Sequence, residues 1–190
     1  MKRSILVALV VAGLGAVAAV AATNNATQAD CNPVPAGVKC QPGNGQKIAG
    51  GKNGSTSHKG WPAFTGILWQ VVTNSNQGFS RTGTQWNDEL LGRNGSDTLN
   101  GGDGNDVIWG DSSNVLNGSR QHDRLSGGNG NDWIYGSHGT NTIKGGAGND
   151  KILAAYGHGT IDCGPGYDTY GASSKHYKVR NCEHKVHKLN

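Results

Sequence analysis

Residues 83–171 repeat a pattern in which one large apolar side chain follows a run of glycine and polar residues. The period is nine residues, except that the unit 110–117 has eight. The apolar residue is the eighth of its unit, which predicts a three-residue strand whose middle side chain faces inward. The expected inward residues are Leu90, Leu99, Ile108, Leu116, Leu125, Ile134, Ile143, Ile152, Ile161 and Tyr170. The pattern therefore predicts an all-β solenoid of short strands.

The first six residues of the best-formed units read G-G-x-G-x-D. Glycines at the first, second and fourth positions can turn sharply and direct carbonyl oxygens to one point, where the aspartate adds a carboxylate. Plain turn chemistry is the alternative, but turns accept Asn or Ser as readily as Asp at the sixth position. Seven of the ten units carry Asp there. Carbonyl and carboxylate oxygens are the ligands that calcium takes, whereas zinc prefers nitrogen and sulfur.

The nonapeptide G-G-x-G-x-D-x-U-x resembles the repeat of the RTX-type calcium-binding β-roll family, and the ending "GTIDCGPGYDTY…NCE" resembles small secreted calcium-binding proteins of actinobacteria. The resemblance implies a parallel β-roll of about five two-nonad coils, with capping strands at both ends and Ca²⁺ as the bound ion. The expected calcium-binding residues are Asp97, Gly101, Gly102, Gly104, Asp106, Asp123, Gly127, Gly128, Gly130, Asp132, Gly145, Gly146, Gly148, Asp150, Gly164, Gly166 and Asp168.

Two nonads per coil place aspartates on the same side every eighteen residues, as for Asp132, Asp150 and Asp168. The strongest sites are expected between turns 127–132 and 145–150, and between 145–150 and 163–168. A weaker pair is expected on the opposite side. It would involve turns 83–88, 101–106 and 118–123, if the short unit 110–117 counts as half a coil. Units with Val115, Asn141 or Gly159 near the sixth position are expected not to bind.

The charge distribution points the same way. Residues 83–171 contain eleven acidic and five basic side chains, a net charge of 5 − 11 = −6, and basic residues dominate after Gly171. A negative middle argues against a nucleic-acid groove and favours a bound cation. Stacked carboxylates repel one another, so we expect the array to be poorly folded without calcium and ordered with it.

The first 22 residues combine a basic start with an apolar run and read as a secretory signal peptide, with cleavage as late as residue 29. A membrane anchor is the alternative. Four cysteines in an exported chain favour disulfides, and nearest-neighbour pairing joins Cys31 to Cys40 and Cys163 to Cys182. A zinc site is the alternative, but the cysteines lack CxxC spacing.

The segments on either side of the repeats predict a linker and two caps. Residues 30–60 are rich in Gly, Pro, Asn and Lys and predict a flexible linker. Residues 61–82 predict an N-terminal cap, with one apolar strand over 63–72, because solenoid ends need covering. Residues 172–190 predict a C-terminal cap and basic tail, with Tyr177 and Val179 on one side of a strand.

The sequence contains no GxSxG or HExxH motif, and no catalytic machinery is expected. His184 and His187 read as a solvated tail, and His122, His138 and His158 as replacements for lost ligands in degenerate turns.

A partner surface is a second hypothesis. The outward side chains Trp109, Trp133 and Tyr135 could stack on sugars or dock a protein. Packing against the terminal segments is the alternative for these rings. An ice-binding face has little support, because the outward threonines form no regular file.

We therefore expect a secreted, extracellular calcium-binding protein with a structural or adhesive role at the cell surface. A cell-wall polysaccharide or another surface protein is the candidate partner. We expect no nucleic-acid partner and no membrane-spanning segment in the mature form.

Overall fold

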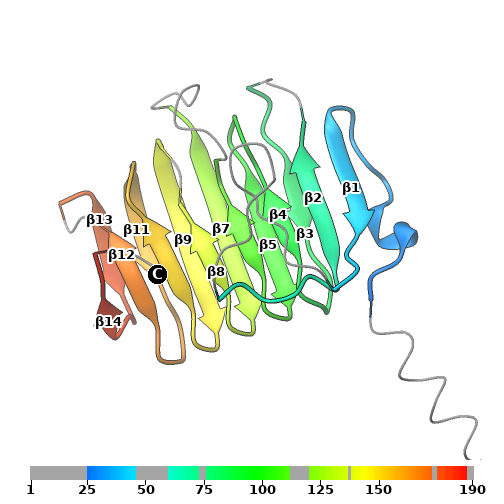
Figure 1. Cartoon of the computed structure of the whole chain (residues 1–190). Coiled ribbons are helices and arrows are strands. Elements are labelled where there is room, and N and C mark those ends of the chain that lie inside the picture. The colour runs from blue at the N-terminus through cyan, green and yellow to red at the C-terminus, as the bar shows by residue number, and fades with distance from the viewer. Residues whose placement is uncertain are drawn as a thin grey trace, which may run out of the picture.

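Two sheets lie face to face, and the chain passes from one to the other in every coil (Figure 1). The computed structural model describes residues 25–45, 60–72, 76–111, 120–136, 138–172 and 175–187. Eight strands form sheet A in the order β1-β2-β4-β6-β8-β10-β12-β14, and six form sheet B in the order β13-β11-β9-β7-β5-β3. All pairings are parallel except β1 with β2. The predicted parallel β-roll is confirmed.

The elements have the following bounds. Sheet A contains β1 (Val38–Pro42), β2 (Ile67–Val71), β4 (Glu89–Leu91), β6 (Val107–Trp109), β8 (Trp133–Tyr135), β10 (Lys151–Ala154), β12 (Thr169–Ala172) and β14 (His184–Lys185). Sheet B contains β3 (Ser80–Thr82), β5 (Thr98–Asp103), β7 (His122–Asn129), β9 (Thr140–Ala147), β11 (His158–Asp162) and β13 (Tyr177–Arg180). A 3-10 helix, η1 (Gln28–Cys31), precedes β1. No helix among these ranges is long and apolar enough to cross a membrane.

The core between the sheets consists of the aliphatic side chains that the nine-residue period marks. In sheet A the register aligns Leu90, Ile108, Ile134 and Ile152, and in sheet B it aligns Leu99, Leu125, Ile143 and Ile161. Each of these side chains is at most 1% exposed. Burying one of them contributes roughly 1.5–3 kcal/mol. Tyr170 is only partly buried, and Leu116 lies outside the described residues.

The eight-residue unit 110–117 is not half a coil, so that expectation is wrong. β6 pairs with β8 and β5 with β7, and the step between equivalent residues is 26 there, as from Ile108 to Ile134. A step of 26 is one eighteen-residue coil plus eight residues. The eight-residue unit is therefore an insertion, and it leaves the pairing register unchanged in both sheets. The extra residues fall between β6 and β7, where 112–119 lie outside the described part of the chain.

The N-terminal segment covers one end of the roll, so the expected flexible linker is wrong for residues 30–45. Strand β1 pairs antiparallel with β2, and a disulfide joins Cys31 to Cys40 with a Cα–Cα distance of 5.6 Å. Cys31 is fully buried in the core. Arg81, at an inward position of β3, donates to the Asp30 carbonyl and lies 4.9 Å over the Trp69 ring. Residues 46–59 of the expected linker, and the expected signal peptide (1–22), lie outside the described residues.

Residues 60–66 form a strap across the outer face of sheet A before the chain enters β2 (Figure 1). Trp61 donates from Nε1 to Tyr135 Oη at 3.1 Å, and its ring meets those of Trp109 and Tyr135 edge to face. Trp133 is 4% exposed and Tyr135 is 7% exposed. The predicted partner surface is therefore wrong, because the strap covers these rings. The alternative prediction, that these rings pack against a segment from outside the repeats, is correct.

The C-terminal end closes with β13 and β14. Tyr177 is buried on β13 and Val179 packs against the core, as the alternation predicts. Cys163 and Cys182 form the second disulfide, with a Cα–Cα distance of 5.2 Å. Both predicted pairings are therefore confirmed.

Candidate metal centre

The turns that lead from sheet B to sheet A lie one above another and form the first turn stack, defined as residues 83–88, 101–106, 127–132, 145–150 and 163–168. The turns that lead from sheet A back to sheet B form the second turn stack. Asp106 and Asp132 are neighbours in the first stack, whereas Asp123 belongs to the second. The expected grouping of turn 118–123 with turn 101–106 is therefore wrong, because the 26-residue coil places turn 118–123 on the other edge.

The aspartates of the first stack form a ladder of hydrogen bonds to the main chain. In each step, the amide of one aspartate donates to the Oδ1 of the aspartate in the following coil. The bonds run from Asp88 N to Asp106 at 2.7 Å, Asp106 N to Asp132 at 2.8 Å, Asp132 N to Asp150 at 2.9 Å and Asp150 N to Asp168 at 2.7 Å. The ladder begins at the Ile67 amide, which donates to Asp88 Oδ1.

A second ladder involves the fifth position of the turn, which the sequence reasoning missed. Here each side-chain oxygen accepts from the amide of the following coil. The bonds run from Asn105 N to Asn87 Oδ1 at 2.7 Å, Asn131 N to Asn105 Oδ1 at 2.6 Å, Asn149 N to Asn131 Oδ1 at 2.7 Å and Tyr167 N to Asn149 Oδ1 at 2.8 Å. The Asn-Asp pair that recurs at the fifth and sixth positions of the turns could have indicated this ladder, because the bond requires a short side chain with an oxygen.

The second carboxylate oxygen of these aspartates is the feature that points to a cation. Oδ2 is buried and has no hydrogen-bond partner on Asp106, Asp132, Asp150 and Asp168, and also on Asp97 of the second stack. An unpaired charge in such a place is strongly unfavourable unless another group compensates it. In the first turn, by contrast, Thr84 donates to Asp88 Oδ2 from its amide at 2.5 Å and from its hydroxyl at 3.0 Å. Thr84 stands where the other turns of this stack have their second glycine.

Glycine at the first position leaves room for this oxygen. A Cβ on Gly127 would overlap both Asp132 Oδ2 and the Gly145 carbonyl oxygen, so both atoms lie beside the same Cα. The equivalent overlap at Gly101 involves Asp106 Oδ2 and the Gly127 carbonyl. A carboxylate oxygen and a carbonyl oxygen of the next coil therefore converge between successive turns. These are the hard oxygen donors that calcium binds.

The second and fourth glycines have a different role. Gly128 has φ of 116° and Gly130 has φ of 130°, values that L side chains rarely adopt. A Cβ on either would also collide with a carbonyl of the preceding coil. These two positions therefore allow the turns to stack at the spacing of the strands.

Burial shifts the titration of the aspartates upward. Desolvation raises the pKa of Asp106 to about 9, where the neighbouring Asp88 and Asp132 charges add to the effect. It raises the pKa of Asp132 to about 7 and of Asp150 to about 6, against the lowering effect of the ladder hydrogen bonds. The pKa of Asp168 is also raised by desolvation. The stack therefore favours either protons or a cation at these carboxylates.

The second turn stack holds fewer carboxylates. Asp97 accepts from Phe79 N through Oδ1, and its own amide donates to Asp123 Oδ1, both at 2.8 Å. Asn141 replaces aspartate in the next unit, and its Nδ2 donates to Tyr177 Oη at 2.8 Å. Tyr177 is the β-ladder partner of Gly159. At the position in this stack where a further carboxylate would be expected, the chain therefore has the buried phenol of Tyr177. The candidate ligands of this stack are therefore confined to its N-terminal half.

The histidines of this edge do not assemble a metal site. His158 shares a hydrogen bond of 3.0 Å with Thr140, and the His138 ring stacks on Tyr156. Among the described residues, no group of three or more His, Cys, Asp or Glu side chains could hold a metal by itself. Any ion in the turns would therefore depend on main-chain oxygens as well as carboxylates.

Comparison with family models identifies the array. The RTX calcium-binding nonapeptide repeat matches in four copies, at residues 82–116, 110–140, 117–152 and 135–170. Searches of curated proteins and of solved structures gave no match. RTX nonapeptide repeats bind Ca²⁺. Residues 82–170 therefore belong to the RTX calcium-binding nonapeptide repeat family, and the chain is a calcium-binding repeat protein.

Proposed function

We propose that this is a secreted protein whose roll becomes stable when calcium binds between turns of the first stack, and that it has a structural or adhesive role at the cell surface. The observation that carries the proposal is the set of buried, unpartnered Oδ2 atoms on Asp106, Asp132, Asp150 and Asp168. Each belongs to a turn of the first stack. Two disulfides fit an oxidising compartment outside the cell.

The strongest binding is proposed between turns 101–106 and 127–132, 127–132 and 145–150, and 145–150 and 163–168. Each of these turns has a sixth-position carboxylate with a free oxygen, and a main-chain carbonyl of the next coil lies alongside that oxygen at Asp106, Asp132 and Asp150. The turn 83–88 is a weaker candidate, because Thr84 already satisfies Asp88. Bound calcium would supply positive charge between the carboxylates, and the residues themselves would provide oxygens at fixed spacing.

A calcium titration tests this proposal. The metal-stripped mature protein is titrated with calcium by isothermal calorimetry, and circular dichroism is recorded at each step. We expect binding of several ions per chain, accompanied by a gain of β signal. Absence of binding heat and an unchanged spectrum would mean that glycines and aspartates serve only as turn formers.

The adhesive role is proposed to involve sheet B, because its outer face is open where sheet A is covered. A groove of about 300 Å³ on this face is lined by Lys144, Lys178, Arg180 and Asp162, with Thr142 and Thr160 between them. Three cations and one anion favour an acidic polymer, and hydroxyl groups suit a polysaccharide.

Co-sedimentation in saturating calcium tests this role, with an acidic and a neutral polysaccharide compared. Binding only to the acidic polymer, weakened by salt and by the double substitution Lys144→Ala and Lys178→Ala, is expected. Equal retention by both polymers would exclude recognition by charge.

A further inference from the structure

The turn between β13 and β14, residues 181–183, is three residues shorter than the repeat turn that it follows. Asp162 pairs with Arg180 in sheet B, and Thr169 pairs with His184 in sheet A. The chain therefore crosses with three residues where the preceding coil uses the six of 163–168. This terminal turn lies beyond residue 170, where the family match ends.

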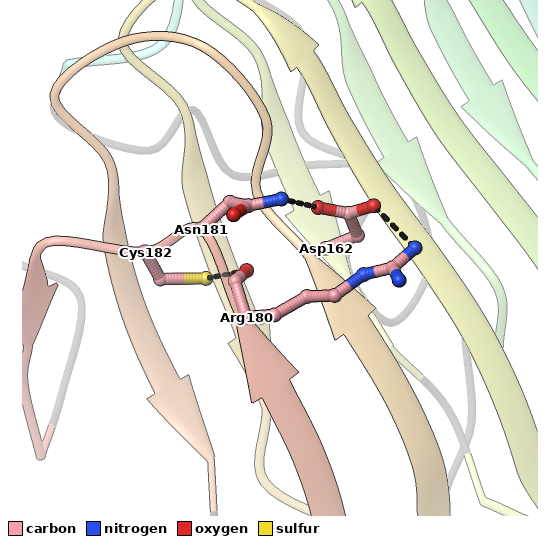
Figure 2. A network of polar contacts seen from close by, with 4 residues as sticks. All are labelled: Asp162, Arg180, Asn181 and Cys182. Carbon is pink, nitrogen blue, oxygen red and sulfur yellow. Dashed lines mark hydrogen bonds and ion pairs between the residues drawn. The ribbon is translucent and has the colours of Figure 1, made fainter.

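Several contacts fix the terminal turn in place. Asn181 has φ of 51°, and its Nδ2 donates to Asp162 Oδ1 at 2.7 Å (Figure 2). Arg180 Nη2 donates to the other oxygen of Asp162, also at 2.7 Å. Cys182 is bonded to Cys163, and its sulfur lies 3.2 Å from the Arg180 carbonyl as a non-covalent contact, since a disulfide sulfur carries no proton. The result is that Glu183 is held next to Asp168.

Glu183 continues the carboxylate ladder. The Asp168 amide donates to Glu183 Oε2 at 2.8 Å, which is the bond that Asp150 N makes to Asp168 Oδ1 at 2.7 Å one coil earlier. Glutamate has one more methylene than aspartate, and this extra reach offsets the shorter turn. A carboxylate of this chain thus occupies the ladder position that the next repeat would have filled.

The neighbouring carboxylate provides an independent indication of a ligand. Asp168 is fully buried, and its Oδ2 has no hydrogen-bond partner. Its Oδ1 is already engaged by the preceding coil, and in the described part of the chain the next turn of the stack is the terminal turn. Asp168 and Glu183 therefore bring two carboxylates together at a constrained turn. Because Glu183 is exposed, water could complete the shell of an ion there, as calcium permits.

We propose that Asp168 and Glu183 bind one additional calcium ion between turn 163–168 and the terminal turn, and so close the array with a site outside the repeats. This inference rests on the proposed function, namely calcium between turns of the first stack. It assigns a ligand role to Glu183, which the repeat pattern does not include.

The substitution Glu183→Gln separates a ligand from a structural residue. A glutamine oxygen can still accept the hydrogen bond from Asp168 N, so the turn keeps its geometry while the charge is lost. Native mass spectrometry then counts the calcium ions per chain, and a competing chromophoric chelator gives their affinities. Asp103→Asn is the control, because it removes a negative charge at the surface and contacts neither the ladder nor the terminal turn.

We expect E183Q to bind one calcium ion fewer than the wild type, or to bind one ion at least about tenfold more weakly, which is a difference of roughly 1.4 kcal/mol. D103N should match the wild type in number of ions. Unchanged number and affinity in E183Q would overturn the inference, and so would the loss of several ions at once, which would mean that Glu183 only supports the fold. A wild type that binds no calcium would instead overturn the proposed function, and this inference with it.

Discussion

Asp132 is the central carboxylate of the first turn stack, and its replacement by asparagine should have opposite effects with and without calcium. Its Oδ1 accepts from Asp106 N, a bond that an asparagine oxygen can keep. Its Oδ2 has no partner, and the Gly145 carbonyl lies alongside, where the new amide could donate. Asn141 already shows that asparagine fits the sixth position of a turn in this protein.

The expected magnitude follows from the pKa of this group. Burial raises the pKa of Asp132 from 3.8 to about 7, so the charged form costs the calcium-free fold about 4 kcal/mol at pH 8. D132N removes this cost, and imperfect placement of the amide takes back part of the gain. We expect a net stabilisation of about 2–4 kcal/mol without calcium. Burial raises the pKa of Asp106 and Asp150 in the same direction, so the calcium-free fold carries further costs of the same sign, and folding should therefore depend on calcium.

Circular dichroism of the metal-stripped protein and thermal unfolding of the calcium-saturated protein, both at pH 8, measure the two effects. Without calcium, D132N should show more β signal than the wild type. With calcium it should unfold at a lower temperature, because two neighbouring sites lose a ligand. Asp103→Asn is the control: Asp103 accepts from Asn129 Nδ2 at 2.8 Å on the surface and does not take part in the ladder. If D132N destabilises both forms equally, the carboxylate is a structural hydrogen-bond acceptor and the electrostatic reasoning is wrong.

Three further predictions concern pH, the turn glycines and the strap. The folded pKa values of Asp106, Asp132 and Glu89 (about 9, 7 and 8) lie above the unfolded ones. The metal-stripped protein should therefore be most stable near pH 4 and lose stability as the pH rises from about 4 to about 9, whereas calcium-saturated protein should lose stability on acidification. Melting curves at several pH values check both signs. Gly127→Ala should weaken calcium binding at least about tenfold, which corresponds to some 1–3 kcal/mol of overpacking. Gly45→Ala is the control: it places a side chain at a positive φ of 80° outside the turn stacks, so it should lower stability but leave calcium binding unchanged by calorimetry. Trp61→Ala should cost about 3–5 kcal/mol in chemical denaturation and increase binding of a hydrophobic dye, with calcium stoichiometry retained; unaltered stability would show that the strap does not hold sheet A.

The repeat itself could be predicted from the sequence because one rule acts at every coil. An aliphatic residue every nine positions gave the inward side chains of both sheets, including Leu99 and Ile143, and the position-six aspartates gave the carboxylate ladder. The disulfide pairs followed from the separation of the cysteines. These features depend on local spacing, which the chain displays directly.

Features that depend on contacts between distant segments could not be predicted. Trp133 and Tyr135 point outward from their own strand, and the strap that packs on Tyr135 lies more than sixty residues earlier in the chain. The assignment of turn 118–123 failed because an eight-residue unit can be either a short half-coil or an insertion, and packing decides between these. Glu183 was missed because the terminal turn does not follow the repeat.

The connection between β6 and β7, which contains the eight-residue unit, shows where this roll tolerates inserted residues. Between Asp111 and Arg120 the polypeptide lengthens one crossing, yet β6 and β8 remain partners in register and the aspartate ladder continues from Asp106 to Asp132 at 2.8 Å. The longer connection therefore leaves the register of the first turn stack unchanged. An affinity tag or fluorescent reporter inserted between Asp111 and Arg120 is therefore expected to leave the ligands of the first turn stack at their spacing.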